Sequence, residues 1–166
     1  LNHAKGYHIF SEAALKFKKI DPSWNFIAIG NEARKEIFPD KNIVKEIGYK
    51  KNSEVLDFYS DSEIAIGNSV WDEPLGRIAI EASSRKCLPI ISNKGGLAES
   101  KNIALVLKEN SSLELVKILK KITKNKSLRR QKQKIFYKNN NFDIKKISKM
   151  LDKIRLEIIE NKKNIN

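Results

Sequence analysis

The stretch Trp71–Ser84, WDEPLGRIAIEASS, places two acidic residues, Glu73 and Glu81, on either side of an almost wholly apolar segment. Glu73 directly precedes a Pro-x-Gly turn. Because proline is well tolerated in the first turn of a helix, we expect a helix to begin near Pro74 and to carry Glu81 two turns farther along. Such a helix would separate the two acids by about 12 Å, which exceeds the roughly 5 to 9.5 Å between the carboxyl groups of a glycosidase acid–base pair. The two acids are therefore expected to hold different parts of one elongated ligand.

The backbone amides of Leu75, Gly76 and Arg77 lie between the two acids in the sequence. At a helix N-terminus such amides lack partners within the helix and favour an anion, and a glycine lets a ligand approach closely. The pattern predicts a phosphate site flanked by two acids, as a sugar joined through a diphosphate to a nucleoside would require. The alternatives are an ordinary first-turn acid at Glu73, a solvated Glu81 and a surface salt bridge at Arg77.

Helical and strand-like segments alternate around this stretch. Residues 4–20 carry an apolar stripe at helical spacing, formed by Ile9, Ala13, Phe17 and Ile20. A helix is expected within residues 52–60, capped by Asn52 or Ser53. Short strands are expected within residues 21–30, 42–48, 62–69, 88–93 and 103–107. We therefore expect an α/β fold: a Rossmann-like, doubly wound parallel sheet of about five strands over residues 1–110, followed by C-terminal helices over residues 111–166.

The net charge of the 166-residue chain is +13 and is unevenly distributed. Residues 1–116 hold 16 basic and 16 acidic residues, whereas residues 117–166 hold 17 basic and 4 acidic residues. A lysine-rich solvated helix face commonly gives such a run, and a nucleic-acid-binding or other interaction domain is the alternative. Binding of single strands needs aromatic side chains among the charges, and the tail offers only Phe136, Tyr137 and Phe142. Nucleic acid is therefore not the expected partner.

Several classes of site are not expected. The sequence has no membrane-spanning run and no signal peptide, so a cytoplasmic location is expected. Classical dinucleotide-binding and P-loop motifs are missing. Cys87 is the single cysteine and is expected to be a small buried hydrophobe. His3 and His8 are not expected to face each other at metal-ligand spacing. A start on Leu1 rather than Met indicates a piece of a longer protein.

Three stretches together resemble a known family. WDEPLGRIAIEASS, GGLAE at Gly95–Glu99 and NHAKGYHIFSEAALKF at Asn2–Phe17 resemble the C-terminal domain of the retaining GT-B glycosyltransferases of family 4. The resemblance runs from Leu1 to about Leu107. It implies one half of a GT-B fold, which binds a nucleotide-sugar donor, while a missing N-terminal domain holds most of the acceptor site. It also implies transfer of the sugar to an acceptor hydroxyl with retention, without a bound metal or cofactor, and an isolated domain that is inactive.

The resemblance also implies roles for individual residues. Glu81 would bind the ribose hydroxyls of the donor, and Glu73 would hold hydroxyls of the donor sugar. The amides of Leu75 and Gly76 would face the diphosphate or the sugar. Lys5 would neutralise the leaving diphosphate together with an arginine that falls immediately before this sequence.

The resemblance to the family also bears on two further pairs of residues. Tyr49 and Lys50 match a loop whose backbone contacts the base of the nucleotide. Gly95 and Gly96 either face the donor or simply turn the chain, and the sequence leaves both interpretations open.

The last stretch, FDIKKISKMLDKIRLEIIENKK at Phe142–Lys163, predicts an amphipathic helix. Its apolar stripe consists of Ile144, Ile147, Leu151, Ile154 and Ile158. One alternative is that the stripe packs wholly on its own domain. The other, which the family resemblance implies, is that the last helix crosses toward the missing N-terminal domain, so that part of the stripe loses its partner here and leads to self-association or to binding of an anionic membrane surface. The second alternative would place the parent enzyme at the inner face of a membrane, in polysaccharide or lipopolysaccharide biosynthesis.

Overall fold

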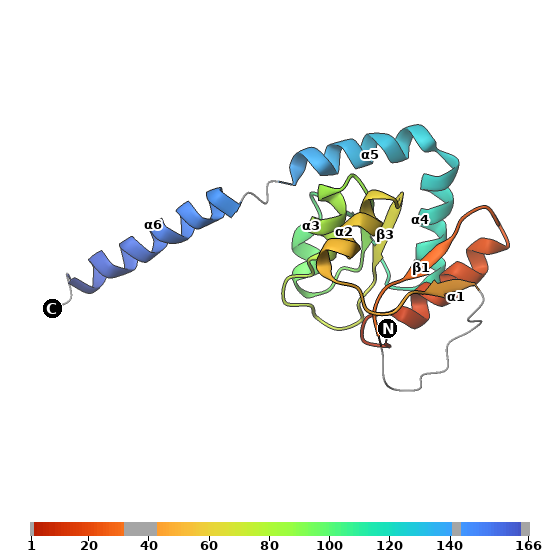
Figure 1. The fold of residues 1–166 in the computed structure, drawn as a ribbon, viewed down its shortest axis with the longest axis horizontal. Helices are drawn as coiled ribbons and strands as arrows, with labels where there is room; N and C mark the ends of the chain where they lie inside the picture. The colour runs from red at the N-terminus through yellow and green to blue at the C-terminus, as the bar shows by residue number, and fades with distance from the viewer. Residues whose placement is uncertain (1, 32–42, 141–143, 164–166) are drawn as a thin grey trace.

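The computed structural model describes residues 2–31, 43–140 and 144–163. Strands and helices alternate through most of this chain, as predicted, and helices end it (Figure 1). The elements are α1 (Tyr7–Lys18), β1 (Phe26–Ala28), β2 (Val44–Glu46), α2 (Asn52–Ser60), β3 (Ile64–Gly67), α3 (Ile78–Ser84), β4 (Leu88–Ile91), the 3₁₀ helix η1 (Gly95–Ser100), β5 (Leu105–Val106), α4 (Ser112–Lys124), α5 (Lys126–Asn139) and α6 (Ile144–Lys163).

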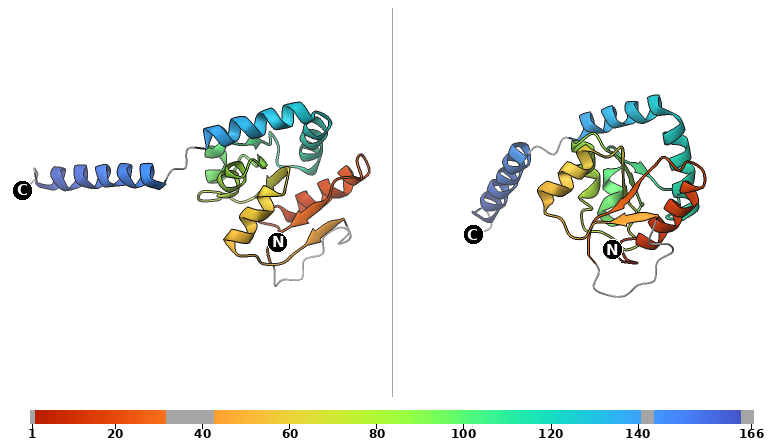
Figure 2. Two further views of the ribbon diagram at one scale, coloured as in Figure 1. Left: turned by 45° about the horizontal axis from the view of Figure 1, so that its top comes forward. Right: turned by 45° about the vertical axis from the view of Figure 1, so that its right-hand side comes forward.

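All pairs of strands in the described chain are parallel, which confirms the predicted fold class. The strands form two sheets rather than one: β1 pairs with β2, and β4 lies between β3 and β5. Helices α1 and α4 pack against each other on one side of the strands, and α2 packs against α3 on the other (Figures 1 and 2). This arrangement of layers brings the carboxyl ends of the strands to one edge of the domain.

The predicted stripe of α1 is confirmed over most of its length. Ile9, Ala13 and Phe17 are buried. Ile20 is exposed, so its place in the stripe was wrong. The helix ends at Lys18 because the chain turns there, with the amides of both Ile20 and the next residue donating to the Phe17 carbonyl at 2.9 Å. A residue beyond this turn no longer follows the helical periodicity.

The cap of α2 also differs from the prediction. The N-cap is Lys51, not Asn52 or Ser53. The backbone amide of Lys51 donates to the Glu54 carboxylate at 2.9 Å. The acid in the first turn therefore satisfies the amide of the N-cap residue, and Lys51 makes no capping hydrogen bond through its side chain. Cys87 is fully buried, as predicted, and burial raises the pKa of its thiol to about 12.

Helices α4 and α5 pack into the same hydrophobic core as the strands, through Leu115, Leu119, Ile122 and Phe136. The start of α4 is fixed by Ser111, whose hydroxyl accepts from the Glu114 amide at 3.2 Å. This N-cap agrees with the predicted start of the C-terminal helices. The largest fully buried apolar side chains of this core are Phe17, Leu88, Ile90, Ile91, Leu97, Leu107 and Leu115.

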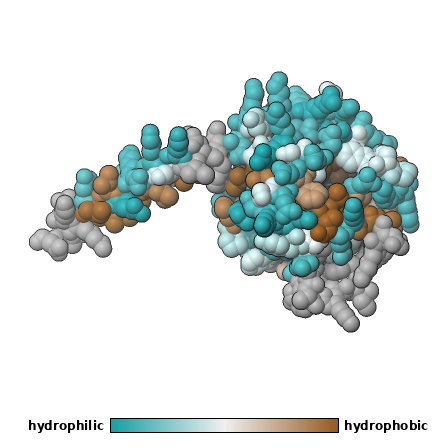
Figure 3. Space-filling view, viewed as in Figure 1, coloured by the Kyte–Doolittle hydropathy of each residue, from teal (hydrophilic) through white to brown (hydrophobic). Residues whose placement is uncertain are grey.

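Helix α6 projects away from the rest of the molecule (Figures 1 and 2). The interpretation in which this helix packs wholly on its own domain is therefore wrong. Its apolar residues lie largely along one side, which is visible as a brown strip in Figure 3. Exposed members are Met150, Leu151, Ile154, Leu156, Ile158 and Ile159. Among the described residues, no helix is both long enough and apolar enough to cross a membrane.

Candidate functional site

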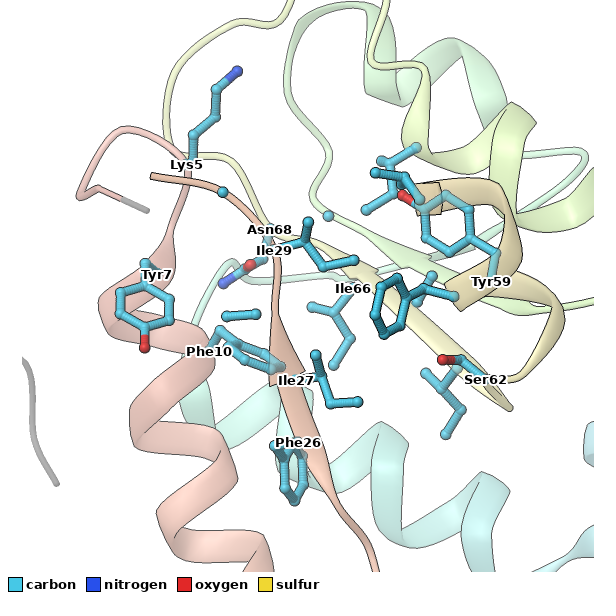
Figure 4. Close-up of a pocket in the computed structure, with 18 of the residues that line it drawn as sticks. Lys5, Tyr7, Phe10, Phe26, Ile27, Ile29, Tyr59, Ser62, Ile66 and Asn68 are labelled. Carbon is cyan, nitrogen blue, oxygen red and sulfur yellow. The ribbon is translucent and has the colours of Figure 1, made fainter. Parts of the chain in front are cut away.

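A cavity of about 1200 Å³ lies between β1 and β3. Figure 4 shows Lys5 and Asn68 at the end that follows the strands, with apolar side chains such as Phe26 deeper inside. Parallel α/β sheets bind ligands beyond the carboxyl ends of their strands. This end of the cavity, called the mouth below, is therefore the candidate site. The charged and polar residues that line this end of the cavity include Lys5, Asn68, Ser69, Glu73, Arg77 and Glu81.

The N-terminal loop is tied to the end of β3. The side-chain amide of Asn68 donates to the Gly6 carbonyl at 2.8 Å, and the Val70 amide donates to the Ala4 carbonyl at 2.9 Å. Gly6 has φ +71°, and a Cβ there would lie 2.0 Å from the carbonyl oxygen of Asn68. Only glycine fits so close to the Asn68 carbonyl. The contact holds the N-terminal loop against the end of β3, and Lys5 therefore lies at the mouth of the cavity.

Lys5 and Glu73 form an ion pair across the mouth, with 2.7 Å between Nζ and Oε1. The Lys5 ammonium also lies 5.0 Å from the ring centroid of Trp71, within range of a cation–π interaction. Burial by itself raises the pKa of Glu73, but hydrogen bonds from Lys5, Ser69 and Trp71 and the charge of Lys5 together outweigh it, so the pKa is lowered from its ordinary value of 4.5. At neutral pH the mouth therefore holds one ammonium and one carboxylate in contact.

The double glycine at positions 95 and 96 holds the loop that carries Glu73. The Gly95 amide donates to the Asp72 carboxylate at 3.0 Å, and the Gly96 amide donates to the Glu73 carbonyl at 2.6 Å. A Cβ on Gly95 would lie 2.5 Å from that carbonyl oxygen, and one on Gly96 would lie 2.4 Å from the carbonyl oxygen of Pro74. The two glycines thus turn the chain and allow two backbone segments to touch.

The predicted helix start near Pro74 is wrong, because α3 begins at Ile78 with Arg77 as its N-cap. Gly76 has φ +66°, a left-handed conformation that cannot continue a right-handed helix, and a Cβ on it would lie 2.4 Å from the side chain of Leu97. The amides of Leu75 and Gly76 therefore belong to a loop and not to a helical turn. The separation of the two acids is consequently not set by helix rise.

Glu81 lies on α3 with its side chain 19% exposed, and it has the partners that a largely buried carboxylate needs. Its Oε1 accepts from the side-chain amide of Asn52 at 3.2 Å. The same oxygen lies 3.7 Å from Nη1 of Arg77, whose side chain is 72% exposed. The salt bridge considered for Arg77 is thus present, one helical turn from Glu81.

Some of the predicted residues do not line the cavity. Lys5, Glu73, Gly76, Arg77 and Glu81 do so. The predicted residues that do not line the cavity are Tyr49, Lys50, Leu75, Gly95 and Gly96.

The loop after β2 keeps its side chains away from the mouth. Tyr49 is exposed, and the ammonium of Lys50 lies 3.4 Å from the Glu54 carboxylate on α2. Leu75 is also exposed.

Asn110 does not line the cavity but supports two residues that do, and the sequence prediction missed it. Its side-chain amide donates to the carbonyl groups of Asn68 and Ser69, at 3.0 and 2.9 Å. These bonds fasten the end of β3 from the far side. Its position shortly after β5, at the same edge of the domain as the site residues, could have indicated this role from the sequence.

His3 and His8, for which the sequence predicted no facing arrangement at metal-ligand spacing, contact each other through their rings. Their rings are stacked, with centroids 3.8 Å apart and planes 4° apart. Stacked rings direct their nitrogens sideways rather than toward a shared ion. In the part of the chain that the structure describes, no group of three or more His, Cys, Asp or Glu side chains is placed to hold a metal ion.

A family model described as "Glycosyl transferases group 1" matches residues 1–140. The chain belongs to the group 1 glycosyltransferases. This family and the parallel α/β architecture agree with the resemblance drawn from the sequence, including the assignment to a GT-B domain. A comparison with the sequences of curated proteins gave no match.

Solved structures of glycosyltransferases share the fold of this group 1 domain. HepE from Anabaena in complex with UDP-glucose has a TM-score of 0.79 at 17% identity, over 95% of this chain and 46% of HepE. The C-terminal domain of LpcC from Francisella tularensis has a TM-score of 0.75 at 22% identity, over 87% of this chain and 83% of that domain. A glycosyltransferase from Rickettsia africae has a TM-score of 0.78 at 22% identity, over 95% and 45% of the two chains. The chain thus spans less than half the length of HepE and of the Rickettsia enzyme.

Proposed function

We propose that this domain binds the nucleotide-sugar donor of a retaining glycosyltransferase, which moves the sugar from a nucleoside diphosphate to an acceptor hydroxyl. The observation that carries the proposal is the convergence of Lys5, Glu73 and Glu81 on one cavity mouth at the carboxyl ends of the strands. The HepE structure, which contains UDP-glucose, supports the class of donor.

Each of the three residues has a distinct role in the proposal. Glu81, held by Asn52, accepts hydrogen bonds from the ribose hydroxyls. Glu73 accepts hydrogen bonds from hydroxyls of the donor sugar. Lys5 stabilises the negative charge that develops on the departing diphosphate as its bond to the sugar breaks and the acceptor oxygen bonds to the anomeric carbon.

Lys5 can take this role without leaving its partner. Its side chain is about half exposed, and an ammonium carries three donors, of which one is directed at Glu73. The two other donors remain for phosphate oxygens. Because Lys5 supplies positive charge to the diphosphate, we propose that donor binding needs no metal ion.

The backbone around the mouth completes the proposed site. The amides of Leu75 and Gly76 face the diphosphate or the sugar, and Arg77 contacts phosphate by leaving its exposed salt bridge. The backbone of Tyr49 and Lys50, which follows β2 at the same edge, contacts the base. For Gly95 and Gly96 the proposed role is indirect, since their contacts hold the loop that carries Glu73.

A complete enzyme in this proposal needs a second domain. The match to less than half of HepE supports an acceptor site on a separate N-terminal domain. The chain alone would then bind donor without transferring sugar.

The projecting helix α6 supports a further part of the proposal. Its exposed apolar side chains, surrounded by lysines, would contact a second copy or an anionic membrane surface. The parent enzyme would then be a cytoplasmic protein at the inner face of a membrane, acting on a polysaccharide or lipopolysaccharide acceptor.

The test is a thermal-shift screen of UDP, GDP, ADP and their sugars, each with and without EDTA. At least one diphosphate should raise the melting temperature, and EDTA should leave the rise unchanged. The matching nucleoside without phosphate is the control and should have little effect. If no nucleotide shifts the melting temperature and calorimetry detects no binding, the proposed donor site is wrong.

A further inference from the structure

A second cleft, of about 400 Å³, lies beside α5 and is called the basic cleft below. It is lined by Lys86, Arg130, Gln133, Lys134, Tyr137 and Lys138, and by no acidic residue of the described chain. Lys86 comes just before β4, whereas the residues of the mouth follow their strands. Because the strands are parallel, the basic cleft lies at the opposite edge of the sheet from the mouth. It is therefore separate from the proposed donor site.

The cations of α5 share one face of the helix. Arg130, Lys134 and Lys138 follow one another at intervals of four residues, so they are neighbours along that face. All three are exposed. Like charges at this spacing repel each other and destabilise a helix, and α5 contains no acidic residue that would offset them. The stability of α5 therefore gives no reason for this row of charges.

Acidic residues of neighbouring elements do not neutralise the basic cleft either. In the part of the chain that the structure describes, no ion pair joins any of its four cations to an acid. Glu63 lies beside the cleft, but its carboxylate accepts from Arg129 at 3.0 Å and from Gln133 at 3.1 Å. The cations of the cleft consequently have no acid as a direct partner within the described chain.

Lys86 has an unusual backbone conformation. Its φ is +59°, and no other non-glycine residue of the described chain has a positive φ. It follows the end of α3, where its amide donates to the Ser83 carbonyl at 3.1 Å and the Cys87 amide donates to the Ala82 carbonyl at 3.0 Å. Glycine usually occupies this position of such a helix end, because a Cβ makes the left-handed conformation unfavourable. The lysine lowers stability here, but it brings an ammonium to the cleft, 5.2 Å from the ring centroid of Tyr137.

The two walls of the basic cleft are fixed relative to each other. The side-chain amide of Asn140, directly after α5, donates to the Ile80 carbonyl at 2.8 Å and to the Ser83 hydroxyl at 2.9 Å. Phe136 anchors the other face of α5 in the hydrophobic core. The backbone that carries the cations is therefore in place before a ligand binds, which lowers the entropic cost of binding.

We propose that the basic cleft binds the phosphate group of a small soluble ligand. A phosphate group carries about 1.5 to 2 negative charges at neutral pH and has three strong acceptor oxygens. One such group can therefore contact cations from both walls at once, whereas a carboxylate has a single charge and two oxygens. The bound anion would offset the repulsion along α5. The inference goes beyond the proposed donor function and does not depend on it.

The lining of the basic cleft favours a free phosphate group over a lipid headgroup. No aliphatic residue of the described chain lines it. Surfaces that bind bilayers combine basic residues with apolar side chains that enter the membrane. In this domain the exposed apolar side chains of that kind lie on α6, away from the cleft.

The test titrates inorganic phosphate into the full chain at constant ionic strength, with chloride as the reference salt. NMR signals of the backbone amides at Lys86 and along α5 should shift and saturate. The double variant Lys134→Gln/Lys138→Gln should raise the Kd of phosphate at least about fivefold. The matched control is Lys120→Gln/Lys124→Gln, which removes two exposed charges at the same spacing from α4. It should change the Kd less than about twofold.

Lys86→Gly separates a role in binding from a role in stability. Glycine suits a φ of +59°, so the melting temperature should rise by about 2 °C or more. The Kd of phosphate should nevertheless increase at least about twofold, because one cation of the cleft is lost. A lysine with only a structural role would leave phosphate binding unchanged.

Three results would overturn the proposal. The first is a titration in which phosphate leaves the signals of the cleft unshifted, and the second is an equal Kd in the two double variants. The third is a Lys134→Gln/Lys138→Gln chain that binds phosphate normally but loses binding to vesicles of phosphatidylcholine and phosphatidylglycerol relative to the control variant, which would assign the cleft to a membrane surface. A failure of the nucleotide screen would leave the proposal standing, because the donor site lies at the other edge of the sheet.

Discussion

Replacing Glu81 by Gln tests the proposed donor site most directly, because it removes one charge and keeps the shape of the side chain. The carboxylate has two partners in the free domain, Asn52 at 3.2 Å and the exposed Arg77 at 3.7 Å. Gln can still accept from Asn52. The lost ion pair lies near the surface and is worth about 0 to 1 kcal/mol, so the melting temperature of the free domain should fall by less than about 4 °C.

The expected effect on nucleotide binding is larger. A ribose hydroxyl bound to a carboxylate makes a charge-assisted hydrogen bond, worth about 1.5 to 3 kcal/mol. Gln keeps a neutral hydrogen bond worth about 0.5 to 1.5 kcal/mol, so the difference of about 1 to 1.5 kcal/mol in Glu81→Gln should raise the Kd of the tightest-binding nucleoside diphosphate about 5- to 13-fold. Isothermal titration calorimetry at constant salt measures this change.

Glu12→Gln is the matched control for this experiment. Glu12 lies on α1, bonds to Lys16 at 2.6 Å and does not line the cavity. This variant should bind the nucleotide as the original chain does. An unchanged Kd in Glu81→Gln, with the fold intact, would refute the role assigned to Glu81, and an equal loss in both variants would indicate a nonspecific effect of charge.

Four further predictions concern the loop, the ion pair, the tail and catalysis. Gly96→Ala should lower the free energy of unfolding by about 2 kcal/mol and weaken nucleotide binding, because its Cβ would lie 2.4 Å from rigid backbone. The control is Gly48→Ala, where φ is +70° but the nearest neighbouring atom lies at 3.8 Å; it should lower the free energy of unfolding by about 1 kcal/mol and leave binding intact. Denaturant titration measures the stability and calorimetry measures the binding. Lys5→Met should raise the pKa of Glu73 in an NMR titration. In the original chain the lowered pKa of Glu73 stabilises the fold above pH 4.5, and this contribution is lost as the pH falls through the folded-state value. In the variant this contribution should shrink, so the free energy of unfolding should fall less steeply over the same pH range. Truncation after Asn141 should abolish self-association and binding to anionic vesicles while nucleotide binding survives, and a full-length chain that stays monomeric and ignores such vesicles would contradict this. The purified chain should transfer no sugar, so robust transfer in a radiolabelled-donor assay would contradict the proposed need for a second domain.

Local patterns in the sequence were enough to predict the alternation of strands and helices, the buried face of α1 and the start of the C-terminal helices at Ser111. These features depend on residues a few positions apart, since helical periodicity and short apolar runs are local properties. The sequence also singled out Lys5, Glu73 and Glu81, which the fold places at one cavity mouth. The resemblance to a family, rather than spacing, connected Lys5 with the two acids.

Contacts between distant parts of the chain decided the rest. The start of α3 moved to Ile78 because Leu97 leaves no room for a Cβ at Gly76, whose left-handed backbone ends the helix. Asn110, which follows β5, bonds to the residues after β3 although β4 lies between these two strands, and no local pattern records such a contact. The sequence could indicate parallel strands but not their spatial order, because each strand is equally apolar whichever neighbour it has. Only the tertiary structure revealed that the described strands form two sheets, one of β1 and β2 and one of β3, β4 and β5.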